Sequence, residues 1–390
     1  MTARAADFEP GAGIESLLSA KEIVIACGSG GVGKTTTVAT AAAMAAVHLD
    51  GRVLALTVDP ARRLANALGL QQVGNIETRV DKKAFAEAGV TARGELWVAM
   101  LDTKASWDEL VRQHAPDRKT AEAILVNPLY RNITAKFVHS HDYIAMERLH
   151  DIHSSGRYDL IVVDTPPTRN AIDFLDAPSR MADFFSSRLL RWLIAPYRSR
   201  LLTAASRPFY SVADRVLGAQ FLQDIADFFI LFQTMYDGFV ERAKAVTRTL
   251  QDDRTSFLVV TTLDPDPVRE AEFFIAELRR RKYHLGAVVF NRVLPAYLRD
   301  RDARVAAERL RDEADELAAT MKIAERDRAA FADVLREVAD SFLGYRALAT
   351  RQAEQLAEFG TASELTLLVP ALEEGVSSIS DIVELGQRLW

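Results

Sequence analysis

The run Gly28–Thr35 has the pattern G-x-x-x-x-G-K-T and constrains the fold more than any other stretch of the chain. Residues 22–27, directly before this run, are apolar in the way that is typical of a short strand, and an alanine-rich helical stretch follows it. Between a strand and a helix, such a loop turns its backbone N–H groups inward, and the helix N-terminus adds partial positive charge. We therefore expect a phosphate-binding loop with nucleotide contacts from Gly28, Ser29, Gly30, Gly31, Val32, Gly33, Lys34, Thr35 and Thr36.

Two side chains of this loop are expected to carry its chemistry. Lys34 has the spacing of the lysine that reaches the β- and γ-phosphates, and Thr35 has that of the hydroxyl that binds Mg²⁺. The pattern alone thus predicts a site for a nucleoside triphosphate with Mg²⁺.

Short apolar runs recur along the chain with helical stretches between them, which predicts an α/β fold with a mostly parallel sheet covered on both faces. These runs are residues 22–27, 53–58, 96–101, 160–163, 257–261, 287–290 and 365–369. We interpret residues 1–390 as one domain of the P-loop NTPase class. Three blocks interrupt the alternation: helical insertions at 103–155 and 170–250, and a charged helical block at 296–360 that resembles a solvated hairpin.

Composition excludes several classes of function. The net charge is −6 with acids and bases interspersed, so we expect no nucleic-acid partner. Cys27 is the only cysteine, which argues against a disulfide framework and a cysteine-bound zinc site. No secretory signal or membrane-spanning run is evident, so the expected location is cytoplasmic.

Two aspartates follow predicted strands and therefore converge with the glycine loop, because ligands bind beyond the carboxyl ends of parallel strands. Asp164 in LIVVDTPPT has the form of a Walker B acid and is expected to hold Mg²⁺, directly or through water. Asp59 in LTVDPARRLANALGL is placed to accept a hydrogen bond from the attacking water. Each could instead be a helix N-cap or a surface acid.

The sequence favours adenine over guanine as the base. Guanine-selective P-loop proteins typically carry N-K-x-D, whereas AVVFNRVLP has Asn291 but Leu294 in the place of the aspartate. An asparagine amide can pair with the N6/N7 edge of adenine. We therefore expect ATP as the ligand, with Asn291 contacting the base.

The motifs GSGGVGKTTT, TVDPARRLANALG, VVDTPPTRNAIDFLDAP, VVFNRVLP and LTLLVPALEE together resemble the anion-transporting ATPases, which include the arsenical pump-driving ATPase and the ATPase that delivers tail-anchored membrane proteins. The resemblance implies a dimeric ATPase in which the loops at Asp59 and Asp164 act as switches and a helical subdomain holds the cargo. It also implies that Asn291 and Pro370 contact the nucleotide, and that Lys34 and Asp59 carry catalysis.

The chain departs from that family pattern at several positions. Ser29 stands where the family's P-loop has a lysine that reaches the partner's phosphates, and Arg62 stands where its first switch has histidine. In the second switch Pro166 replaces alanine, and Arg169 and Asn170 replace Gly-His. Arg62 or Arg169 could supply the missing cation. The cysteines that bind metalloid or bridging zinc in the family have no counterpart.

Three further features allow more than one interpretation. The phenylalanine-rich segment 174–239, with FFILF at Phe228–Phe232, is either core or a groove for an apolar client. His139, His141, His150 and His153 cluster, but a solvated helix end explains them better than a metal site. The C-terminal amphipathic segment is expected to pack back on the domain through Ile379, Ile382, Val383 and Leu389.

Three hypotheses follow from these residues. The first is an ATP-hydrolysing dimeric switch, a homodimer or a heterodimer with a lysine-bearing paralogue, that binds an apolar protein segment or a membrane partner. The second is a low-turnover regulatory subunit of a hetero-oligomeric ATPase. The third is a partition-type ATPase, which would require a basic face that the sequence lacks.

Overall fold

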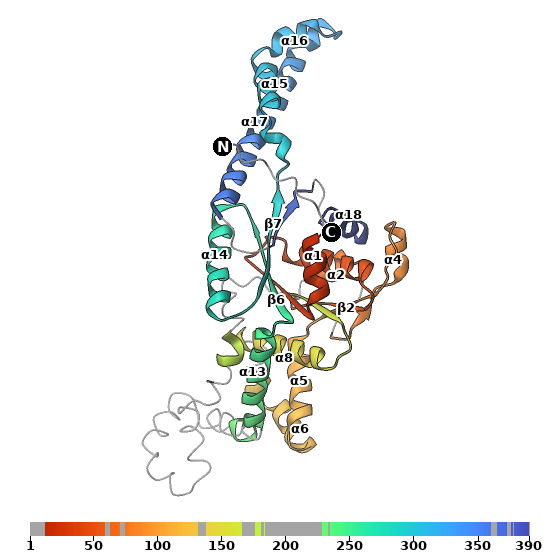
Figure 1. Ribbon diagram of the computed structural model, residues 1–390, viewed down its shortest axis with the longest axis vertical. Coiled ribbons are helices and arrows are strands. Elements are labelled where there is room, and N and C mark those ends of the chain that lie inside the picture. The colour runs from red at the N-terminus through yellow and green to blue at the C-terminus, as the bar shows by residue number, and fades with distance from the viewer. Residues whose placement is uncertain are drawn as a thin grey trace, which may run out of the picture.

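A computed structural model describes residues 12–58, 63–70, 75–131, 138–165, 176–180, 183, 228–232, 235–359, 365–372, 376 and 378–389. An eight-stranded sheet forms its centre, in the order β3-β4-β2-β5-β1-β6-β7-β8 (Figure 1). Only the β3–β4 pair is antiparallel. The strands are β1 (Ile23–Cys27), β2 (Arg52–Thr57), β3 (Thr78–Arg79), β4 (Glu95–Met100), β5 (Leu160–Asp164), β6 (Thr255–Thr262), β7 (Leu285–Val293) and β8 (Thr366–Pro370).

Helices cover both faces of this sheet, which explains why its central strands carry apolar residues on both faces. Along β1, Ile23 and Ile25 belong to one hydrophobic core, and Val24 and Ala26 belong to the other. On the second face lie α1 (Ala12–Ala20), α2 (Lys34–His48), α3 (Arg63–Ala67), α4 (Lys82–Glu87) and α18 (Ile379–Leu389). Alternating residues of a strand point to opposite faces, so two covered faces require a continuous apolar run.

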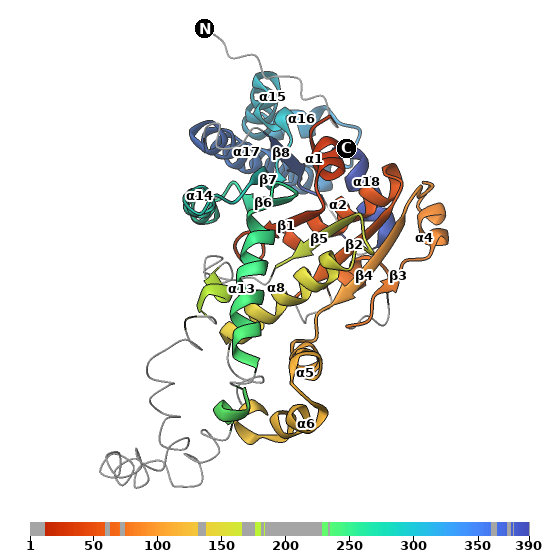
Figure 2. The ribbon, with the colours of Figure 1, turned by 60° about the horizontal axis from the view of Figure 1, so that its bottom comes forward.

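The first face carries the larger core and the helices that lead away from it. These are α5 (Thr103–His114), α6 (Arg118–Val126), α8 (Val138–Ser154), α13 (Tyr236–Gln251) and α14 (Pro265–Arg280). In Figure 1, α5, α6 and α13 extend below the sheet, and Figure 2 shows α8 crossing beside α13. The helices α5, α6 and α8 lie in the predicted helical block 103–155, and residues 128–131 of this block are also helical, whereas much of 170–250 lies outside the described residues.

A helical arm projects from the opposite end of the molecule (Figure 1). It consists of the 3₁₀ turns η2 (Ala296–Arg299) and η3 (Glu325–Asp327) and the helices α15 (Arg301–Asp312), α16 (Ala314–Thr320) and α17 (Arg328–Phe359). α15 and α16 pack on the 32-residue α17. Ion pairs of i,i+4 spacing line α15, as the sequence predicts for a solvated hairpin: Arg304 contacts Glu308 at 2.8 Å and Arg309 contacts Glu313 at 2.7 Å.

The predicted strands are all present, and their ends differ by a few residues from the expected ranges. No pattern in the sequence predicts β3, because a two-residue antiparallel edge strand has no periodicity to detect. The C-terminal helix α18 packs against α2 with Ile379, Ile382 and Val383 buried, as expected, while the side chain of Leu389 lies outside the described residues. Among the described helices, none is long and apolar enough to cross a membrane.

Candidate nucleotide site

The glycine loop connects the end of β1 to the start of α2 and adopts a backbone that glycine alone permits. Gly28, Gly31 and Gly33 have φ values of 149°, 79° and 100°. A Cβ at Gly28 would lie 2.0 Å from the carbonyl oxygen of Val260, and a Cβ at Gly33 would lie 2.0 Å from Nδ2 of Asn291. Positive φ and these close approaches explain the residue type at both positions. The loop thus brings backbone N–H groups to the N-terminus of α2, an arrangement suited to an anion.

Lys34 is the first residue of α2 and is 6% exposed. Its Nζ donates hydrogen bonds to the carbonyl oxygens of Gly28 (3.0 Å) and Ser29 (2.9 Å). The ammonium group therefore lies across the loop, where phosphate oxygens could replace these carbonyls. Ser29 Oγ is buried and makes no hydrogen bond with the described residues. A buried hydroxyl with unused capacity fits a loop that receives an oxygen-rich ligand.

A carboxylate and two hydroxyls meet beside the loop at the end of β5. Asp164 is 1% exposed, and its Oδ2 accepts hydrogen bonds from Thr35 Oγ1 (2.8 Å) and Thr57 Oγ1 (3.2 Å). A buried carboxylate beside a hydroxyl is the type of hard-oxygen set that Mg²⁺ accepts, usually with phosphate and water completing the octahedron. Thr35 and Asp164 therefore meet, as the sequence predicts.

Thr57 is a member of this cluster that sequence reasoning missed. β2 and β5 are parallel neighbours, and their register places Thr57 directly opposite Asp164. The position of Thr57 two residues before Asp59 was the only available signal, since the register itself is a tertiary property.

Asn291 and Pro370 come to the same edge of the sheet from β7 and β8. Asn291 Nδ2 donates to the carbonyl oxygen of Val32 (2.8 Å), so its amide holds the glycine loop. Pro370 ends β8 opposite Val293, whose carbonyl oxygen accepts a hydrogen bond from the next residue, Ala371 (3.0 Å). The two residues predicted to contact the nucleotide are thus on adjacent strand ends beside the loop.

The comparison with known families agrees with this geometry. A family model described as anion-transporting ATPase matches residues 21–323, which include the loop, both strand-end aspartates and Asn291. The chain belongs to the anion-transporting ATPase family. It is therefore an ATPase, and it uses ATP with Mg²⁺.

Several relatives match over most of their length. The ATPase ASNA1 homolog of Cryptosporidium parvum is 26% identical over 296 residues, which cover 74% of this chain and 69% of the relative. ATPase BagA of Mycobacterium tuberculosis is 23% identical over 391 residues, covering 97% and 95%. ATPase GET3 of Scheffersomyces stipitis is 24% identical over 305 residues, covering 74% and 78%.

The residues expected to move with nucleotide in this family lie mostly outside the described part of the chain. Asp59, Arg62, Pro166, Arg169 and Asn170 all belong to undescribed segments. The structure does describe the strand ends at which these segments begin. There the N–H of Val58 donates to the carbonyl oxygen of Asp164 (3.1 Å). Both expected switch segments therefore start from adjacent strand ends beside Thr35 and Asp164.

Cys27 is structural in this ATPase. Its Sγ is buried and donates to the carbonyl oxygen of Leu258 (3.3 Å). Burial raises the pKa of the thiol well above its usual value, and the charge of Lys34 opposes this only in part. The thiol is thus neutral and a poor nucleophile at neutral pH.

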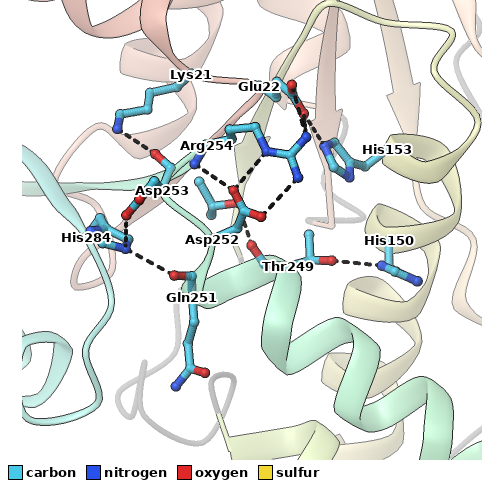
Figure 3. A network of polar contacts seen from close by, with 11 residues as sticks. Lys21, Glu22, His150, His153, Thr249, Gln251, Asp252, Asp253, Arg254 and His284 are labelled. Atoms are coloured by element: carbon cyan, nitrogen blue, oxygen red, sulfur yellow. Dashed lines mark hydrogen bonds and ion pairs between the residues drawn. The ribbon is translucent and has the colours of Figure 1, made fainter.

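Figure 3 shows the polar contacts of His150 and His153. These contacts lie near the start of β1, whereas the glycine loop follows the end of that strand. His150 Nδ1 lies 2.9 Å from Thr249 Oγ1, and His153 Nε2 lies 2.6 Å from a carboxylate oxygen of Glu22, the residue before β1. Glu22 also pairs with Arg254 at 3.1 Å. Within the described residues no group of three or more His, Cys, Asp or Glu side chains could hold a metal. His139 and His141 have side chains outside the described residues.

The described aromatic residues of segment 174–239 are buried. Phe228 and Phe232 are each 3% exposed and Met235 is 2% exposed. Their rings and thioether join the core beneath α8 and α13, where Phe232 packs on Phe239 with 5.0 Å between ring centroids. The core interpretation therefore holds for these three residues, and the phenylalanines of the segment before Phe228 lie outside the described residues.

Proposed function

We propose that this ATPase is a nucleotide-dependent dimeric switch in which Thr35 and Asp164 hold Mg²⁺ and Lys34 contacts the β- and γ-phosphates. The observation that supports this most directly is the 2.8 Å contact between Thr35 Oγ1 and the buried carboxylate of Asp164. In this proposal Asp59 orients the attacking water, and Asn291 and Pro370 contact adenine. Loop, metal ligands and both switch segments then share one edge of the sheet.

The metal assignment has a direct test. Asp164→Asn removes the negative charge but keeps the side-chain shape and its ability to accept from Thr35. We expect binding of ATP without metal to persist, whereas the gain in affinity on adding Mg²⁺ should disappear along with turnover. Titration calorimetry with and without Mg²⁺ measures both. A variant that retains the full Mg²⁺-dependent gain would show that Asp164 does not hold the metal.

We propose that the helical insertion at 170–250 couples nucleotide state to an apolar protein segment. The family resemblance supports this, as does a sequence in which Leu189, Leu190 and Trp192 form part of an apolar stretch. Because Phe228, Phe232 and Met235 are already buried in the core, we place the client contact in the part of the insertion before them.

Co-purification in ADP and in ATP tests the coupling. Changing Leu189, Leu190 and Trp192 together to serine should reduce recovery of an apolar client in one nucleotide state and leave the melting temperature unchanged. Phe273→Ser is a control for the loss of an apolar side chain outside the insertion, since this ring is 62% exposed on α14. Recovery by the triple variant that equals that of the unaltered chain in both nucleotide states would refute the proposed contact.

We further propose that the chain pairs with a related subunit that has a lysine at the position of Ser29, and that its own turnover without such a partner is slow. The short neutral side chain of Ser29 cannot supply a cation to a partner's phosphates. A cation supplied in trans is worth roughly 10³–10⁵ in rate in well-studied P-loop enzymes. The buried and unsatisfied Ser29 Oγ supports a site that is incomplete in the single chain.

Mixing experiments distinguish a homodimer of this chain from a heterodimer with a lysine-bearing paralogue. The purified chain alone should hydrolyse MgATP well below about 1 s⁻¹, and adding a lysine-bearing paralogue from the same genome should raise activity above the sum of the two. Fast hydrolysis by the chain alone, unchanged by Arg62→Ala, by Arg169→Ala and by the paralogue, would contradict the heterodimer.

A further inference from the structure

The chain after Asn291 leaves β7 in an unusual conformation. Arg292 has φ of 60°, a left-handed value that residues with a side chain adopt uncommonly. The pairing of β7 with β8 shifts register between Phe290 and Val293. The N–H of Arg292 donates to Asn291 Oδ1 (2.9 Å). The Arg292 N–H at this kink thus helps to orient the Asn291 amide, whose Nδ2 donates to Val32 in the glycine loop, and other contacts must hold the kink in place.

Those contacts come from Gln352, on the arm helix α17, 60 positions later in the chain. Gln352 Oε1 accepts from the N–H of Leu294 (2.8 Å), and Nε2 donates to the carbonyl oxygen of Arg292 (3.2 Å). The side-chain amide of Gln352 thus binds the carbonyl oxygen of the residue before Val293 and the N–H of the residue after it. The pairing fixes both the backbone and the orientation of the glutamine.

An aromatic contact anchors the same helix to the same strand. Phe359, the last residue of α17, packs edge-to-face on Phe290, with 4.9 Å between ring centroids, and both rings are buried. Phe290 directly precedes Asn291. The base of α17 is therefore joined to the end of β7 by apolar packing on one side and by a two-point hydrogen bond on the other.

We infer that Gln352 is a positioning residue that holds Asn291 in place and thereby sets the preference of the site for adenine. The contacts run from Gln352 to Arg292, from Arg292 to Asn291, and from Asn291 to Val32 in the glycine loop. The two protein contacts of Asn291 use one of its two N–H groups and one of its two acceptor lone pairs. The other N–H and lone pair are what the N7/N6 edge of adenine requires.

The inference rests on the proposed adenine contact of Asn291, and its test uses nucleotide preference as the readout. Gln352→Met keeps the length of the side chain but removes its donor and acceptor. Gln355→Met is the control: Gln355 lies one turn further along α17, and its Nε2 donates to Glu358 (3.0 Å) at an exposed site away from the loop. Titration calorimetry of the full chain measures Kd for MgATP and MgGTP in each protein.

We expect Gln352→Met to weaken MgATP binding about tenfold while MgGTP binding changes little, because the strand end then loses the two hydrogen bonds that hold the Asn291 amide toward the base, whereas the phosphate contacts are common to both nucleotides. Gln352→Glu keeps the acceptor for Leu294 but loses the donor to Arg292, so its ratio of the two Kd values should be intermediate. Gln355→Met should match the unaltered chain. A general loss of stability would weaken both nucleotides alike.

The outcomes distinguish a failure of the Gln352 inference from a failure of the proposed adenine contact of Asn291. If the unaltered chain binds MgGTP as tightly as MgATP, or if Asn291→Ala leaves the preference intact, the proposed adenine contact is wrong. If Asn291→Ala abolishes the preference but Gln352→Met and Gln352→Glu both retain it, the adenine contact stands and Gln352 has no positioning role.

Discussion

Replacing Arg242 with methionine should destabilise the helical region below the sheet in a way that depends on pH. Arg242, on α13, pairs through Nε with Glu147 Oε1 at 2.6 Å, and Glu147, on α8, is 1% exposed. The hydroxyl of Tyr143 donates to the other carboxylate oxygen at 2.6 Å. The guanidinium also lies 4.8 Å from the ring centroid of Phe239. One buried ion pair thus joins two helices of the core.

The magnitude follows from what the carboxyl group of Glu147 does without its partner. Removing one member of a buried pair costs about 3–5 kcal/mol, since a buried charge is left uncompensated. The carboxyl can escape part of this cost by taking up a proton, at about 1.36 kcal/mol for each pH unit above its unfolded pKa of about 4.3. Protonation of Glu147 therefore limits the destabilisation from its unpaired carboxyl to about 3.7 kcal/mol at pH 7 and about 1 kcal/mol at pH 5. We therefore expect a loss near 3–4 kcal/mol at pH 7, with a further 0.5–1 kcal/mol from the cation–π contact at either pH.

The sign of the pH dependence follows from the direction of the pKa shift. Burial raises the pKa of Glu147 even beside Arg242, and the variant should raise it further. When the folded-state pKa of Glu147 lies above its unfolded-state pKa, the contribution of this carboxyl to stability is fully present below the unfolded-state pKa. That contribution is lost as the pH rises through the folded-state pKa. Arg242→Met should therefore lose least stability near pH 5 and most near pH 7.

Urea denaturation at the two pH values measures this difference. The double variant Arg242→Met with Glu147→Gln is the control, because it keeps the neighbouring titratable groups His114 and Asp151 and removes only the carboxyl in question. It should regain most of the stability at pH 7 and lose the added pH dependence. An equal loss in the single variant at pH 5 and pH 7 would refute the assignment of the cost to a buried, unpaired Glu147.

Three further changes test the site and the core. Lys34→Ala should abolish tight MgATP binding in a calorimetric titration, because it removes the charge that faces the phosphates; unchanged affinity would remove that role. Asp59→Asn should keep MgATP binding but lower steady-state hydrolysis by about 10² or more if Asp59 positions the water; full turnover would exclude it. Changing Phe228, Phe232 and Met235 together to serine should lower the melting temperature sharply, since each large-to-small core change costs about 2–5 kcal/mol; an unchanged melt would show that they are not core.

The local sequence determined the parts of this ATPase that depend on neighbouring residues. The glycine loop follows from its spacing between a strand and a helix, because its backbone and its helix N-terminus make the phosphate site with no distant residue. The central strands follow from their apolar runs, because a strand covered on both faces has no polar side. The charged arm follows from i,i+4 acid–base pairs such as Arg304 with Glu308.

Only the tertiary structure decided which distant side chains complete the site. Thr57 meets Asp164 because two parallel strands pair in one register, which is set by packing across the whole sheet. Asn291 contacts the glycine loop from the end of β7, where the next residue, Arg292, is left-handed, and a glutamine from the arm helix holds that kink. Such contacts join residues far apart in the chain, so no local pattern of spacing or hydrophobicity records them.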